Sequence, residues 1–83
     1  MKTFEEILEK LKKHFKDGQV ELLNTSSQHI GHNSSGMHLK AIIKDNSFKG
    51  ISTLDQHRIV HNLLKDEIGN EIHAITIQTS YFE

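Results

Sequence analysis

Seven histidines and no cysteine are the feature of this 83-residue sequence that most directly suggests chemistry. Imidazole nitrogens bind zinc, nickel, copper and iron, and histidine is the side chain that titrates nearest neutral pH. The absence of cysteine excludes a disulfide scaffold and any metal site built only from this chain's own thiolates. The positions of the histidines in the chain therefore decide what they can do together.

Three of the histidines lie in or next to a polar stretch over residues 24–37, which is rich in Asn, Ser, His and Gly. A loop of this length in so small a domain is usually a functional site or a mobile excursion, so we treat it as a candidate site. His29 and His32 have the spacing His-x-x-His, which can chelate zinc or nickel. No nearby acidic residue completes that ligand set.

Two amphipathic helices are predicted around this loop. The first runs from Thr3 to Lys16, begins with the capping-box spacing of Thr3 and Glu6, and is followed by Gly18. The second is capped by Ser52 or Thr53 and is predicted to end at Gly69 and Asn70. The apolar residues that recur at helical spacing are Phe4, Ile7, Leu8, Leu11 and Phe15 in the first helix, and Leu54, Val60, Leu63, Leu64 and Ile68 in the second.

Three strands complete the prediction. A short strand carries Val20 and Leu22, and a second from His38 to Lys44 is expected to pair antiparallel with it. Phe48, among turn residues, is expected to anchor the core.

The third strand is predicted from Glu71 to Thr79. Its alternation places His73, Ile75 and Ile77 on one face, with His73 at the start of the apolar row. The order αββαβ indicates an α+β domain in which helices cover one face of a three-stranded sheet.

Length and charge limit the functional classes. Residues 1–83 are predicted to form one domain around one core. The net charge of −1 gives no overall attraction to a phosphate backbone. The sequence contains no apolar run that could span a membrane and does not open like a signal or transit peptide, so a cytoplasmic location is expected.

Several segments together resemble the BolA-like proteins. They are Phe48-Lys49-Gly50-Ile51-Ser52, Gln56-His57-Arg58, Ile72-His73-Ala74, and the loop with Ser26-Ser27-Gln28-His29 followed by Gly31-His32 and His38. The resemblance covers the chain from about Leu22 to Thr79. Asn24 replaces a frequently acidic residue and Leu39 a frequent Phe.

The resemblance implies a class II K-homology-like fold with a mixed sheet, and a monothiol glutaredoxin as partner. The two proteins would share a [2Fe-2S] cluster in iron–sulfur cluster trafficking or in redox or iron sensing. The glutaredoxin and its glutathione would each supply a thiolate, and this chain would supply His73 and His29, with His32 in reserve for His29. Two histidines make at most half of such a ligand set, so the partner is required.

The remaining histidines and the only arginine have alternative interpretations. His38 is expected to be structural, and His14 and His61 to lie on helix surfaces. His57 and Arg58 either belong to a solvated helix face with an intradomain salt bridge, or meet the glutaredoxin and its glutathione, because a guanidinium fork suits carboxylates.

Two other functional classes, a nucleic-acid-binding regulator and an enzyme, are the alternatives to a glutaredoxin-binding adaptor. The K-homology-like fold and the transcriptional roles of some family members support a nucleic-acid-binding regulator. However, Gly31 and Gly36 do not form a Gly-x-x-Gly loop and enclose no Lys or Arg. An enzyme is not expected, because the Ser-rich loop offers no oriented base or oxyanion site. Alone, the chain is expected to be a monomer or weak homodimer without membrane association.

Overall fold

The computed structural model describes residues 2–25 and 36–83. Along the chain it contains helix α1 (Phe4–His14), strands β1 (Gln19–Asn24) and β2 (Met37–Lys44), the 3₁₀ helix η2 (Asn46–Phe48), helix α2 (Thr53–Leu63) and strand β3 (Ile72–Ser80). The predicted α+β class and the order αββαβ are confirmed. Neither α-helix is long and apolar enough to cross a membrane in the part of the chain that is described.

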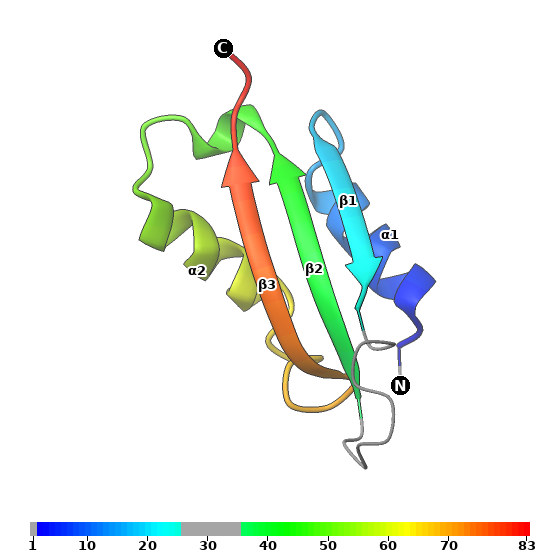
Figure 1. Cartoon of the computed structure of the whole chain (residues 1–83). Coiled ribbons are helices and arrows are strands. Elements are labelled where there is room, and N and C mark those ends of the chain that lie inside the picture. Colours follow the sequence, from blue (N-terminus) through cyan, green and yellow to red (C-terminus); the bar gives the residue numbers. More distant parts are fainter. Residues whose placement is uncertain (1, 26–35) are drawn as a thin grey trace.

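The three strands form one mixed sheet in the order β1-β2-β3. β1 pairs antiparallel with β2, as predicted, and β2 pairs in parallel with β3. Figure 1 shows α1 and α2 behind the same face of this sheet, α1 behind β1 and α2 beside β3. No helix of residues 2–25 and 36–83 covers the opposite face of the sheet.

The core lies between the sheet and the two helices. Ile7 and Leu11 of α1 are fully buried there, and Phe15 packs its ring 5.4 Å from that of Phe48. Phe48 is fully buried, which confirms its predicted role as an anchor. The other buried apolar residues are Leu22, Leu39, Ala41, Ile43, Val60, Leu64, Ile72 and Ile77.

The helix starts follow the prediction. Thr3 and Glu6 form the reciprocal capping box, with the Thr3 amide donating to Glu6 Oε1 over 3.0 Å and the Glu6 amide donating to Thr3 Oγ1 over 3.2 Å. Ser52 caps α2 and accepts from the Asp55 amide. These bonds satisfy N–H groups that a helix start leaves without intrahelical partners.

Both helices end earlier than predicted. α1 stops at His14, with Phe15 in a non-helical conformation. α2 stops at Leu63, although its apolar spacing continues to Ile68. The chain turns at residues 64–67, and this turn brings Glu67 to Lys10 of α1. Apolar periodicity does not distinguish a continuing helix from a series of turns that also buries Leu64.

A buried carboxylate ties α1 to the turn before β3. The Glu67 side chain is 1% exposed, and its oxygens lie 3.0 Å from Lys2 Nζ and 2.9 Å from Lys10 Nζ. Burial opposes its charge, but the hydrogen bonds and charges of Lys10 and Lys2 outweigh burial and hold the pKa of Glu67 below its ordinary value. The Glu67 carbonyl also accepts the amide of Ile72, the first residue of β3.

Glu67→Gln is expected to lower the free energy of unfolding by about 2 kcal/mol at neutral pH, because Lys2 and Lys10 lose their charged partner. The loss is moderate because both lysine side chains are partly solvated. Because the pKa of Glu67 is lower in the folded state than in the unfolded state, its carboxylate stabilises the fold at pH values above the ordinary carboxyl pKa. This stabilisation is lost as the pH falls through the folded-state pKa. The difference between wild type and variant should therefore shrink from about pH 6 to about pH 3 in urea titrations.

Glu9→Gln is the control, since Glu9 is an exposed carboxylate on α1, the helix that carries Lys10. It should change stability by less than about 0.5 kcal/mol. A Glu67→Gln difference that stays constant with pH would contradict the role given to this carboxylate.

Candidate functional site

His73 lies at the start of β3 and is exposed. The sequence places it on the apolar face with Ile75 and Ile77, and this prediction is wrong. Ile72, the preceding residue, takes the buried position. The imidazole is therefore accessible at one end of the sheet and does not extend the core.

An irregularity in the pairing of β2 with β3 causes this displacement. Met37 pairs with Ile72, but His38 pairs with Ala74, so the register shifts by one residue and His73 is the extra residue. A β-bulge of this kind interrupts the alternation of side chains and re-aims one of them. The next core-facing positions on β3 are Ile75 and Ile77, which continue the normal period of two.

Gly36 holds the backbone beside the bulge. Its φ of +97° favours glycine, and a Cβ built there would lie 3.1 Å from the His73 nitrogen and 3.1 Å from the Asn70 oxygen. The next residue, Met37, donates its amide to the Glu71 carbonyl over 2.7 Å. A residue with a side chain at position 36 would push β2 away from the start of β3.

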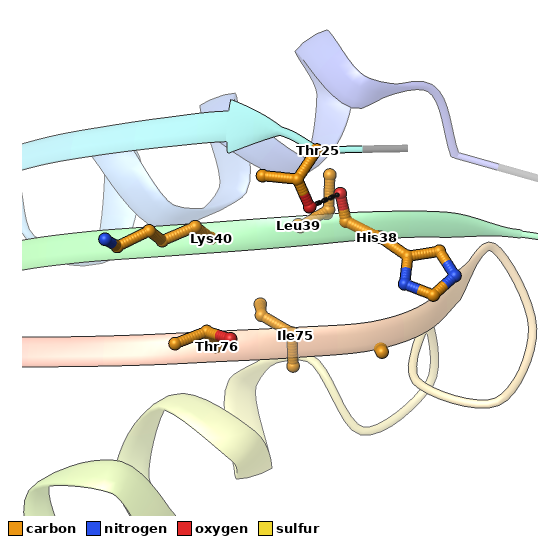
Figure 2. A pocket seen from close by; sticks show the side chains of 7 residues that line it. Thr25, His38, Leu39, Lys40, Ile75 and Thr76 are labelled. Carbon is orange, nitrogen blue, oxygen red and sulfur yellow. Dashed lines mark hydrogen bonds between the residues drawn. The ribbon is translucent and has the colours of Figure 1, made fainter. Parts of the chain in front are cut away.

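Thr25 approaches the same end of the sheet from β1. Its amide donates to the His38 carbonyl over 2.7 Å. Its Oγ1 donates to the same carbonyl over 3.0 Å (Figure 2). Thr25 and Gly36 are the described residues on either side of positions 26–35. Thr25 contacts His38, and Gly36 lies beside the His73 backbone. The predicted ligands His29 and His32 lie outside the described residues.

His38 is the histidine that the structure brings beside His73. Their ring centroids are 5.0 Å apart with planes inclined by 44°. The sequence interpretation assigned His38 a structural role and missed this contact. Figure 2 shows the His38 ring reaching from β2 toward the beginning of β3.

A hollow of about 310 Å³ opens on the sheet next to this pair. Its lining residues are Thr25, His38, Leu39, Lys40, Ala74, Ile75 and Thr76. Because Leu39, Ala41 and Ile43 face the core, the alternating residues Lys40 and Lys44 stand on the sheet face away from the helices. The sheet face away from the helices therefore carries imidazoles at one end and two lysines farther along the central strand, Lys40 and Lys44, which we call the lysine row.

A carboxylate lies close to His73 in sequence. Glu71 Oε2 accepts the Lys2 amide over 2.8 Å. That backbone hydrogen bond holds the pKa of Glu71 below its ordinary value. The segment entering β3 is thus fixed to the N-terminal end of α1 as well as to β2.

His57 and Arg58 are not brought to His73. His57 is half-buried and borders a second hollow with Ile77, Gln78, Thr79 and Ser80, in the later part of β3. Arg58 is exposed and forms an ion pair with Asp55, 3.2 Å away on the same helix. This is the intradomain salt bridge that the sequence left as one interpretation of Arg58. His14 and His61 are exposed, as expected for helix surfaces.

Comparison with known proteins identifies relatives over most of the chain. Residues 11–82 match the family model described as BolA-like protein. Human BolA-like protein 1 is 37% identical over 59 residues, which cover 71% of this chain and 43% of that protein. The DNA-binding transcriptional regulator BolA of Vibrio cholerae is 33% identical over 73 residues, covering 88% of this chain and 69% of that protein.

A solved structure supports the same relationship. The BolA domain of SufE1 from Arabidopsis thaliana superposes with a TM-score of 0.77 and 34% identity, covering 90% of this chain and 86% of that one. The chain spans less than half the length of the human relative, so conclusions on whole-protein activity do not transfer with the fold.

Gly36→Ala is expected to cost about 1–3 kcal/mol of folding free energy because it adds a strained φ and a backbone clash. Gly50→Ala is the matched control, since Gly50 has a φ of +81° but no atom within 4 Å of a built Cβ. In ¹⁵N NMR spectra, the Gly36 variant should shift the amides of His38 and His73 while the Gly50 variant leaves them in place. Equal spectra for both variants would show that Gly36 does not hold this end of the sheet.

Proposed function

The chain belongs to the BolA-like protein family, and from this premise we propose that it is an adaptor that binds a monothiol glutaredoxin through a shared, glutathione-ligated [2Fe-2S] cluster. The observation that carries the proposal is the exposed position of His73 at the end of the sheet. The cluster is the cargo of the complex, to be passed on or sensed. The proposal gives this chain no catalytic step.

The donor atoms of this chain suit one half of such a cluster. Neutral imidazole replaces thiolate in Rieske-type [2Fe-2S] centres and raises their reduction potential. This chain has no cysteine, so the thiolates must come from the glutaredoxin and glutathione, and the histidines of this chain would supply nitrogen ligands. An exposed His73 can meet a partner without local unfolding.

His29 is proposed as the second ligand from this chain, with His32 in reserve. His29 is four residues after Thr25 in the sequence, a contour length of at most about 14 Å. Because Thr25 contacts the His38 carbonyl, this length permits an approach to His73. His32 lies four residues before Gly36 and has a similar reach.

Arg58 is proposed as a contact for the partner or its glutathione. Its side chain is 67% exposed, and its ion pair with Asp55 spans one helical turn on the surface. Exposed pairs of this kind contribute little stability, so exchanging Asp55 for a carboxylate of the partner costs little. His57 would accompany it at the edge of β3.

A DNA-binding regulator is the second candidate, favoured by the similarity to the DNA-binding transcriptional regulator BolA of Vibrio cholerae. Lys40 and Lys44 on the helix-free sheet face are the cations that such a role would use. The net charge of −1 limits the electrostatic contribution to binding.

The glutaredoxin proposal predicts that reconstitution with a monothiol glutaredoxin, glutathione, iron and sulfide gives a heterodimer. Its visible circular dichroism spectrum should differ from that of the glutaredoxin homodimer. His73→Ala should abolish this difference, whereas His61→Ala, an exposed histidine on α2, should preserve it. A His73→Ala complex with the wild-type spectrum would exclude His73 as a ligand.

The DNA candidate predicts measurable binding at micromolar protein with a steep salt dependence. Lys40→Ala and Lys44→Ala should each reduce the slope of log affinity against log salt by about 1. Fluorescence anisotropy with a labelled duplex measures this slope. Absent binding, or a slope that neither variant changes, would reject a role for this lysine row in DNA recognition.

A further inference from the structure

The spacing of His38 and His73 matches that of two imidazoles on one metal ion. A zinc–nitrogen bond of about 2.0–2.1 Å places the ring centroid about 3.1 Å from the metal, so tetrahedral coordination separates two centroids by about 5 Å. The observed separation is 5.0 Å. The separation of the two rings is therefore the one expected for two imidazoles on one tetrahedral ion.

The backbone around both histidines is already fixed. Thr25 holds the His38 carbonyl through two hydrogen bonds, and Gly36 lies so near the start of β3 that a Cβ built there would be 3.1 Å from the His73 nitrogen. Rotation about the last side-chain torsion of histidine has a broad, roughly two-fold profile, so the exposed His73 ring can turn either nitrogen toward the ion. Because both ligands are carried by paired strands, binding does not have to order the backbone, which lowers its entropic cost.

From this geometry we propose that His38 and His73 form a two-histidine site for a divalent transition metal such as zinc. In residues 2–25 and 36–83 no cluster of three or more metal-ligating side chains occurs. The ion would thus keep positions for water or for a donor from another molecule, as open zinc sites do. Imidazole ligands favour zinc, nickel and copper over magnesium and calcium.

This proposal does not depend on the glutaredoxin partnership. It uses the isolated chain, and it assigns a ligand, His38, that the cluster proposal does not use. Because both proposals use His73, zinc and the shared cluster would exclude each other. Each proposal can still fail while the other stands.

The test removes the His-x-x-His pair of the loop first, with the double variant His29→Gln/His32→Gln as the parent protein. Zinc chloride is titrated into this parent and followed by calorimetry and by ¹⁵N NMR of the histidine rings. We expect one zinc per chain, with the ring signals of His38 and His73 shifting together and those of His57 and His61 unchanged. A titration in which neither His38 nor His73 shifts overturns the proposal, whatever the variants below show.

His38→Phe in the same parent keeps an aromatic ring beside His73 but removes the ligand nitrogens. It should weaken zinc binding by roughly tenfold or more. Removing a residue that only hydrogen-bonds to a ligand already costs about that much, so removing a ligand should cost at least as much. His61→Phe, at an exposed helix position, should bind zinc as the parent does. Unchanged zinc affinity in a folded His38→Phe variant would show that His38 is not a ligand.

Discussion

The position of His73 depends on one extra residue in the pairing of β2 with β3. Without the register shift between Met37 and His38, alternation along β3 would turn His73 toward the helices with Ile75 and Ile77. With it, Ile72 closes the core and His73 is exposed beside His38. The same irregularity therefore completes the hydrophobic core and presents an imidazole at the surface.

The contacts that surround the bulge come from the residue after β1, the residue before β2 and the turn before β3. Gly36 packs on the backbone before β3, Thr25 binds the His38 carbonyl, and the Glu67 carbonyl accepts the amide of Ile72. Glu67 in turn is held by lysines of α1 and of the segment before it. A buried carboxylate that lost these lysines would be costly, so the N-terminal helix contributes to the site although it lies on the other face of the sheet.

Much of the fold could be predicted from sequence because its signals are local. Thr3 and Glu6 mark a helix start, Phe48 lies alone among turn residues, and apolar alternation identifies β2. The bulge was missed because a period of two was extended back from Ile77 to His73. A signal was present, since the apolar positions Ile72 and Ile75 are three residues apart and break that period. The contact between His38 and His73 could not be predicted, because the two residues are more than thirty positions apart in the sequence and their contact depends on the register of β2 with β3.

In the proposed complex, this cysteine-free chain would complete the ligand set of the cluster with imidazole but could not provide the thiolates. The most direct test is an NMR titration of the ¹⁵N-labelled chain with apo and with cluster-bound monothiol glutaredoxin. Only the cluster-bound partner should broaden the His73 ring signals beyond detection, while the amides of Gln78 to Ser80 at the far end of β3 remain visible. Broadening centred on the lysine row of β2, or identical spectra with both forms of the partner, would contradict the account.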